Sequence, residues 1–323
     1  MRFVYRIGDE RGSRVDMKKS DVEFTADDGT ILRGYFFTPE HGPGPHPAIA
    51  MALGMAGVIT GGPSRIVKQM VDSSPDYAIL FYDARTRGQS DGEPRWDIDP
   101  DREQQDLQAA LSYLESRDDV DNDRLGLWGT STGASHVFVV AAFDPRVKAV
   151  VGQVPLIDGY DMLLQMGGLS VVSTVKRVIL ECRRAVQRGE EMPRLRMVYT
   201  DTAERVAGEF VLQPGEKTWE YARTGPWGPP QGWDDTATFL SLERFLKYDI
   251  RGVMDKISPV PLLMIITTGD ELTPTASSLK AYELALEPKK LVLAPGDHYG
   301  VDLPGPGMDI AVSEAIDWFE SHL

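Results

Sequence analysis

Cysteine and long apolar runs are both scarce in this chain of 323 residues. The single cysteine, Cys182, excludes an internal disulfide and is typical of a reducing compartment such as the cytoplasm. No uninterrupted apolar run reaches about 18 residues, so the sequence predicts no membrane-spanning helix. The first ten residues contain no apolar stretch of the kind found in secretory signals. Together these scarcities predict a cytoplasmic protein without a membrane partner.

Positive charge is also in short supply. Lysine and arginine number 34 against 49 aspartates and glutamates, which gives a net charge of −15. Such an excess of carboxylates disfavours binding to nucleic-acid phosphates and to anionic membranes. No set of side chains has the spacing of metal ligands, so neither a metal nor another cofactor is expected. Hydrophobic residues make up 42% of the chain, which suffices for a large core.

Short apolar runs recur along the chain and predict strands that alternate with helices. A hairpin turning at Asp27-Asp28-Gly29 opens the series, and the predicted strands are 22–26, 32–39, 46–53, 77–83, 125–128, 147–155, 262–266 and 290–293. Helical periodicity follows Asp101, where Gln104 is placed like a capping-box partner, and returns over residues 308–319. This alternation predicts an α/β fold, a mostly parallel eight-stranded sheet with helices on both faces.

The motif with the clearest chemistry is Gly129-Thr130-Ser131-Thr132-Gly133. An apolar run precedes it and an apolar helix pattern follows, which is the strand–turn–helix context of a nucleophile elbow. Side chains two positions before and after the serine would collide with nearby backbone, which explains both glycines. The context predicts that Ser131 is a nucleophile of an α/β-hydrolase fold.

The same Gly-x-Ser-x-Gly pattern occurs a second time, at Gly88-Gln89-Ser90-Asp91-Gly92. There the following residues have the composition of a turn, and no apolar helix pattern follows. We therefore assign Ser90 to a polar loop without a catalytic role.

A serine nucleophile requires a base, and the chain has five histidines. His41 and His46 precede the elbow in a turn rich in proline and glycine, His136 lies a helical turn and a half beyond Ser131, and His322 is at the terminus. His298 remains, on a glycine-bounded loop after the last predicted strand.

The base in turn needs a carboxylate that orients it. Asp270 directly follows the strongly apolar strand 262–266, with Glu271, Asp297 and Asp302 as the less favoured carboxylates. The order Ser131, Asp270, His298 along the chain is the order of an α/β-hydrolase triad.

The remaining parts of the predicted site are an oxyanion hole and a substrate pocket. Backbone N–H groups of Thr132 and of Met55, which follows the third strand, are expected to hold the oxyanion. Residues 157–257 break the strand–helix alternation and predict an inserted helical cap between two parts of the core, 1–156 and 258–323. The residues predicted to bind substrate are Gly54, Trp219, Tyr221, Trp227 and Trp233.

Several segments resemble a dienelactone-hydrolase-related group of α/β-hydrolases, which includes bacterial hydrolases and fungal polyketide transferases of secondary metabolism. They are residues 83–95, the elbow with His136-Val137, Gln153-Val154-Pro155 and residues 262–274, and the similarity extends from Val22 to His322. The resemblance implies the same triad. Relatives often carry His-Gly where this chain has Leu53-Gly54, and true dienelactone hydrolases use a cysteine nucleophile. Dienelactone is therefore not the expected substrate.

These features predict a serine hydrolase that cleaves an ester, lactone or thioester, with no cofactor. An acyltransferase with the same triad, moving a polyketide-type chain onto an alcohol or amine, is the main alternative. A slow hydrolase-like ligand-binding protein is a further one. The expected partners are a small acyl substrate, which an acyl carrier could present, and a second copy of the chain in a homodimer.

Overall fold

The computed structural model describes residues 4–5, 17–40, 44–55, 57–59, 65–73, 76–197, 211, 218 and 236–323. Its main element is a nine-stranded sheet with the order β1-β2-β3-β5-β4-β6-β7-β10-β11. All eight predicted strands are present: β2 (Met17–Thr25), β3 (Ile31–Pro39), β4 (His46–Ala52), β5 (Ala78–Tyr82), β6 (Val120–Thr130), β7 (Val147–Gln153), β10 (Leu262–Thr267) and β11 (Lys289–Ala294). The two-residue strand β1 (Val4–Tyr5) is added at one edge.

Six neighbouring strands, from β5 to β11 in the sheet order, run parallel. The hairpin of β2 and β3 continues the sheet antiparallel to β5. Its turn is closed by Asp28, whose side chain accepts a hydrogen bond from the Thr30 N–H, and by Gly29 at a φ of 88°. The predicted fold class and the predicted opening hairpin are therefore confirmed.

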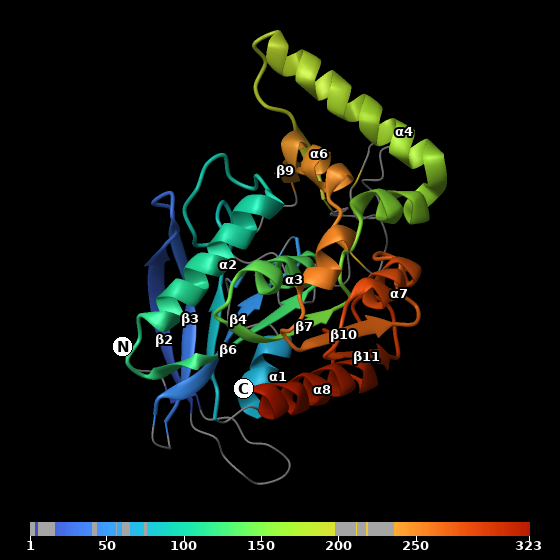
Figure 1. Ribbon diagram of the computed structural model, residues 1–323. Coiled ribbons are helices and arrows are strands. Elements are labelled where there is room, and N and C mark those ends of the chain that lie inside the picture. The colour runs from blue at the N-terminus through green and yellow to red at the C-terminus, as the bar shows by residue number, and fades with distance from the viewer. Residues whose placement is uncertain are drawn as a thin grey trace.

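Helices cover both faces of the sheet (Figure 1). One face packs against α2 (Pro100–Glu115), α3 (Thr132–Phe143), the 3₁₀ helix η2 (Arg251–Lys256) and α7 (Thr275–Leu284). The other face packs against α1 (Arg65–Ser73) and α8 (Pro306–His322). The apolar residues predicted to form the inner stripe of α2, such as Leu107 and Leu111, are fully buried. Helices cover both faces of the sheet, so the loops lie at the carboxyl and amino ends of the parallel strands.

The predicted start of α2 is wrong in detail. The cap of α2 is Asp99, whose side chain accepts hydrogen bonds from the backbone N–H groups of Asp101 and Arg102, with Pro100 in the first turn. Gln104 has no capping role, and its side-chain amide donates to the Tyr248 hydroxyl instead. Proline suits the first helical position because it lacks the N–H that would otherwise be unsatisfied there, so the helix starts one residue earlier than the acidic pattern suggests.

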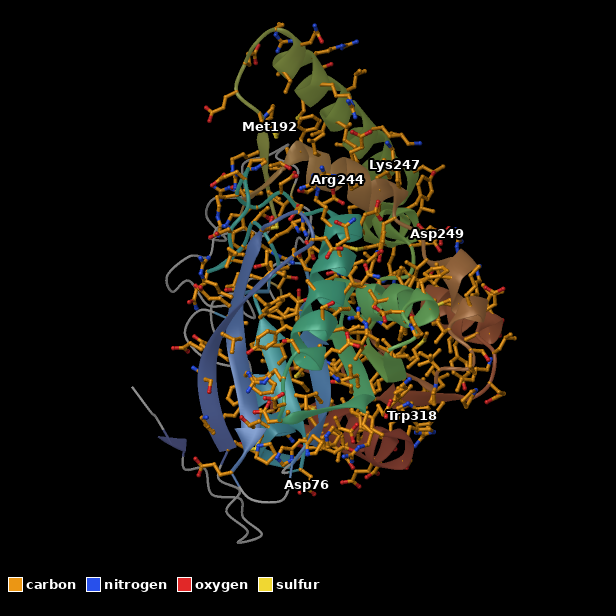
Figure 2. The ribbon with its side chains drawn as sticks, turned by 60° about the vertical axis from the view of Figure 1, so that its left-hand side comes forward. Asp76, Met192, Arg244, Lys247, Asp249 and Trp318 are labelled. Carbon is orange, nitrogen blue, oxygen red and sulfur yellow. The ribbon has the colours of Figure 1, made fainter. Side chains whose placement is uncertain are left out.

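Beyond the carboxyl ends of the parallel strands lie α4 (Gly159–Gln187), β8 (Arg194–Arg196), β9 (Thr236–Thr238) and α6 (Phe239–Lys247) (Figure 1). Figure 2 shows Met192, Arg244 and Lys247 at this end of the molecule, with Asp76 and Trp318 at the opposite end. All four elements belong to the segment 157–257, whose role as a cap remains a prediction. Its two ends join the core, since Ile157, Ile250, Met254 and Ile257 pack beneath α3.

Helix α4 changes direction at Gly167 and Gly168, the second of which has a φ of 68°. Among the described residues it is the one helix whose length and composition match a membrane span, with a mean hydropathy of 1.3 over its best window. The search for uninterrupted apolar runs missed it because Lys176 and Arg177 interrupt the run. A single match of this kind is weak evidence for a span, and only 22% of that window is buried inside the protein.

Candidate active site

Ser131 lies in the turn between β6 and α3 with a φ of 56° and a ψ of −120°. Positive φ is uncommon for residues other than glycine and is maintained only where surrounding contacts impose it. Here the Ser131 N–H donates to the Gln153 carbonyl at 3.0 Å, and the Ser131 carbonyl accepts from the Leu156 N–H at 3.2 Å. Both partners lie at or just beyond the end of β7. The neighbouring strand thus holds the turn in its strained shape.

The glycines on either side of Ser131 allow this turn to pack closely. A Cβ atom on Gly129 would lie 2.3 Å from the Gly133 carbonyl oxygen, and one on Gly133 would lie 2.4 Å from the Ala52 carbonyl oxygen. Real Cβ atoms do not approach backbone oxygens so closely. The collision expected from the sequence motif is therefore present on both sides of the serine.

The structure brings Ser131, Asp270 and His298 together from three different loops. His298 Nε2 lies 3.2 Å from Ser131 Oγ, and His298 Nδ1 lies 2.8 Å from Asp270 Oδ2. Ser131 and His298 are buried, with 8% and 6% of their surface exposed. Because β6, β10 and β11 are parallel, their carboxyl ends meet at one edge of the sheet, and residues far apart in the chain converge there.

Asp270 is held by four hydrogen bonds. Its Oδ1 accepts from the backbone N–H groups of Leu272 and Thr273, and its Oδ2 accepts from the Thr273 hydroxyl at 2.7 Å and faces His298. Burial alone would raise the pKa of Asp270, but the His298 charge and these hydrogen bonds outweigh it and lower the pKa. The carboxylate is therefore charged and fixed in orientation. Sequence reasoning missed Thr273, although a threonine three residues after the aspartate is a recognisable turn signal.

The serine and histidines that sequence reasoning set aside have other surroundings. Ser90 lies in a loop but is buried, since its hydroxyl donates to the Asp83 carbonyl and accepts from the Arg33 N–H. His136 is buried beside Glu103, and His322 packs against Trp318 rather than fraying from the end of α8. His41 lies outside the described residues.

Of the residues predicted for the oxyanion hole, Thr132 directly follows Ser131 and Met55 directly follows Gly54, a predicted substrate contact. Gly54 lies so close that a Cβ there would be 3.2 Å from Ser131 Cβ, so glycine keeps the space beside the hydroxyl open. Met55 is buried, and its carbonyl accepts a hydrogen bond from the Arg87 guanidinium. Arg87 is paired in turn with Glu103 at 2.7 Å. Neither Arg87 nor Glu103 was predicted to matter, yet they anchor the loop that carries Met55.

A small enclosed cavity lies beside Met55 and Thr132. Most of its surface is apolar, and its lining residues are Met55, Ile98, Pro100, Thr132, His136, Leu156, Ser241, Phe245 and Tyr248. Residues from α6 and from the core share in it, so the cavity is formed where the segment 157–257 meets the sheet. The predicted aromatic substrate contacts Trp219, Tyr221, Trp227 and Trp233 lie outside the described residues.

Further contacts tie the segment 157–257 to the triad. Gln165 of α4 donates to the backbone carbonyl of Asp270 at 3.1 Å. The ring of Tyr299 packs edge-on against His298, and its hydroxyl donates to Thr218 at 3.0 Å. The packing of α4 therefore bears on the position of the triad loops. Within the described residues, no three histidine, cysteine or carboxylate side chains form a cluster that could hold a metal ion.

Buried charge beneath the loop that carries Met55 has consequences for stability. Burial lowers the pKa of His136 to about 3, with the Arg87 charge acting in the same direction. Burial also raises the pKa of Glu103 to about 7, although the Arg87 charge opposes this. His136 is thus neutral in the folded protein over a pH range in which an unfolded histidine becomes charged.

We expect His136 to weaken the protein in acid. Its folded pKa lies below the ordinary value of 6.5, so unfolding takes up a proton as the pH falls from about 6.5 towards 3. The free energy of unfolding should fall by about 2 kcal/mol between pH 7 and pH 5 from this residue alone. Glu103 acts with the opposite sign, since its raised pKa favours the folded state at low pH and loses this effect as the pH rises through about 7.

Urea denaturation of the wild type and of His136→Asn at both pH values isolates the histidine. The variant should lose about 2 kcal/mol less than the wild type on acidification. Equal losses in the two proteins would contradict the assignment of a neutral buried His136.

A comparison with protein families matches this chain to the model described as X-Pro dipeptidyl-peptidase (S15 family) over residues 28–300. That span covers most of the chain and includes Ser131, Asp270 and His298. The match extends across both parts of the sheet and across the segment 157–257.

Several full-length fungal proteins are similar to this chain. Polyketide transferase ATR5 of Stachybotrys chlorohalonatus is 28% identical over 86% of this chain and 89% of its own length. Thiohydrolase AneE of Aspergillus aculeatus is 26% identical over 84% of this chain and 83% of its own. Polyketide transferase GrgF of a Penicillium species is 28% identical over 95% and 98%. The crystal structure of α/β-hydrolase GrgF aligns with a TM-score of 0.77 and 26% identity over 94% of this chain and 98% of that one. The predicted resemblance to fungal polyketide transferases is confirmed.

Proposed function

Because this chain belongs to the X-Pro dipeptidyl-peptidase (S15) family of α/β-hydrolases, we propose that it is a serine hydrolase that cleaves an ester, lactone or thioester. The observation that carries the proposal is the line of contacts from Asp270 through His298 to the strained Ser131. A nucleophile, a base and an orienting carboxylate within hydrogen-bonding distance form the arrangement that activates a serine.

In the proposed reaction, Ser131 Oγ attacks the acyl carbon while His298 Nε2 takes its proton. The bond to the leaving alcohol or thiol then breaks, and His298 returns the proton to it. Water attacks the acyl-enzyme, His298 takes the proton of the water, and Ser131 regains it as the acid is released. Asp270 remains charged throughout and stabilises the imidazolium. The N–H groups of Thr132 and Met55 would hold the oxyanion, at about 3 kcal/mol for each donor.

The relatives and the cavity support the proposed substrate class. The family description names a peptidase, whereas the relatives that align over 84% to 95% of this chain are named transferases and a thiohydrolase. The cavity beside Met55 and Thr132 is largely apolar, and its volume of about 10 Å³ leaves room for one small apolar group such as the end of an acyl chain. We therefore place esters and thioesters ahead of Xaa-Pro peptides as substrates.

An acyltransferase is the second candidate function, and the names of two relatives favour it. ATR5 and GrgF are both called polyketide transferases. Hydrolase and transferase would load Ser131 in the same way and differ only in whether water or an alcohol or amine attacks the acyl-enzyme.

Burst kinetics with a chromogenic acyl ester separate the two functions. For a hydrolase, release of the chromophore should continue steadily in buffer alone, because water completes each cycle. A stoichiometric burst followed by almost no turnover, relieved by an alcohol that becomes acylated, would establish the transferase. Cleavage of an Xaa-Pro chromogenic peptide faster than of any ester would contradict both acyl readings.

We further propose that residues 157–257 form the cap and that the small cavity beneath it receives the end of the acyl chain. Phe245 on α6 lines the cavity, so Phe245→Leu should enlarge it at a smaller cost in stability than truncation to alanine. The ratio of kcat/KM for long over short p-nitrophenyl esters should rise about tenfold. Phe143→Leu is the matched control, because Phe143 is 62% exposed at the end of α3. An unchanged ratio in Phe245→Leu would exclude the cavity as the acyl site.

A further inference from the structure

We propose that the second half of α4 docks an acidic protein that carries the acyl group as a thioester. This surface, residues 169–187, is called the arm below. The inference rests on the proposed function, since it supposes that the acyl group loaded onto Ser131 arrives on a protein.

The outward face of the arm is both apolar and basic. Leu169, Lys176, Leu180 and Arg184 follow one another at helical spacings of seven, four and four residues, so they share one side of the helix. All four are exposed, Leu169 and Leu180 by 68% and 47%. The opposite side packs into the protein and is buried, at Val175, Ile179 and Cys182. Exposed apolar side chains grouped on one face mark a surface that meets a partner.

The charge of the arm is opposite to that of the whole protein. Residues 169–187 contain four basic side chains and one carboxylate, Glu181, whereas the net charge of the chain is −15. Arg183 pairs with Glu243 and Arg184 pairs with Glu181, and the two arginine side chains remain 54% and 57% exposed. The arm would attract a carboxylate-rich partner through its local positive charge. The negative charges on the rest of the protein oppose this little, because charges more than about 8 Å away are screened at physiological salt.

The arm begins at the active site. Gln165, four residues before Leu169, bonds the backbone of Asp270, and the change of direction at Gly167 and Gly168 leads the helix away from the core (Figure 1). A protein seated on the first residues of the arm would therefore lie at the same end of the molecule as the triad. That is where a carrier must sit to deliver a tethered thioester to Ser131.

Two other occupants are less well supported. An anionic membrane would also attract basic and apolar side chains, but as an extended plane it would face the acidic body as well as the arm. A second copy of this chain would bring two bodies of charge −15 together. A small carrier meets the projecting arm alone.

The test compares one acyl group on two carriers. The probes are octanoyl-loaded bacterial fatty-acid carrier protein, which is acidic, and octanoyl-N-acetylcysteamine, a small thioester. The docking variant is Lys176→Glu/Arg184→Glu. The matched control, Lys18→Glu/Lys148→Glu, changes the net charge equally at the amino ends of β2 and β7, the edge of the sheet opposite the triad. The docking variant should lose about tenfold in kcat/KM on the carrier substrate and nothing on the small thioester. The control should match the wild type on both.

Equal carrier kinetics in the two variants would overturn the proposal. If the docking variant instead lost only co-sedimentation with phosphatidylglycerol-containing vesicles, the arm would be a membrane surface. If it converted a wild-type dimer to a monomer with carrier kinetics unchanged, the occupant would be a second copy. Ser131→Ala on the small thioester reports on the proposed function separately, since no docking is involved.

Discussion

Ser131→Ala is expected to lower kcat for an activated ester about 10⁶-fold, because removal of the nucleophile disables the triad as a unit. Steady-state hydrolysis of a p-nitrophenyl ester measures the effect. Residual rates should match the few orders of magnitude above water that substrate binding and the oxyanion donors supply without a nucleophile.

Ser90→Ala is the matched control, because Ser90 lies in the second Gly-x-Ser-x-Gly of the chain. The Ser90 hydroxyl holds the loop after β5 through Asp83 and Arg33, so its loss should reduce stability but leave the rate per folded molecule close to that of the wild type. A Ser131→Ala protein with undiminished turnover would remove the assigned nucleophile.

Asp270→Asn is expected to lower kcat about 10⁴-fold at neutral pH while leaving the fold intact. The amide is similar in shape, but it neither carries the charge that stabilises an imidazolium nor holds the Nδ1 proton that the base requires. In the folded protein Asp270 is kept charged by His298 and by the hydrogen bonds from Thr273. The measurement is kcat for a p-nitrophenyl ester, together with urea denaturation to verify folding.

Glu271→Gln provides the comparison, since Glu271 is the exposed neighbour of Asp270 in the same turn. Glu271→Gln should retain wild-type activity within a factor of about two. A substitution on the surface that breaks no buried contact usually has a small effect. If Asp270→Asn were no slower than Glu271→Gln, the carboxylate partner of His298 would have to be sought elsewhere.

The parts of this protein that sequence reasoning predicted well are those with local signals. Apolar runs located all eight main strands because parallel strands covered on both faces are apolar throughout. The elbow was recognisable because its glycines and the apolar runs on either side lie in one short segment, although the contacts that require Gly133 come from the distant Ala52. Asp270 and His298 were expected at one edge of the sheet because each follows an apolar strand, and the structure places both side chains in contact with each other and with Ser131 through His298.

Other features depend on contacts that no local pattern encodes. Arg87, Glu103 and His136 come from three separate segments, and as charged or polar residues each would be assigned to the surface if judged alone. Their burial beneath Met55 is a property of the assembled sheet. The helix α1 was missed because its nine residues are short for a periodicity argument. The change of direction in α4 depends on two adjacent glycines whose effect the sequence leaves open.

Covalent labelling tests the central claim, that Ser131 is activated by His298, most directly. The protein is treated with a fluorophosphonate, digested, and mapped by mass spectrometry, alongside His298→Ala and Ser131→Ala. The structure predicts a single adduct on the peptide containing Ser131, strongly reduced in His298→Ala and absent in Ser131→Ala. Label on Ser90, or equal labelling of Ser131 without His298, would contradict it.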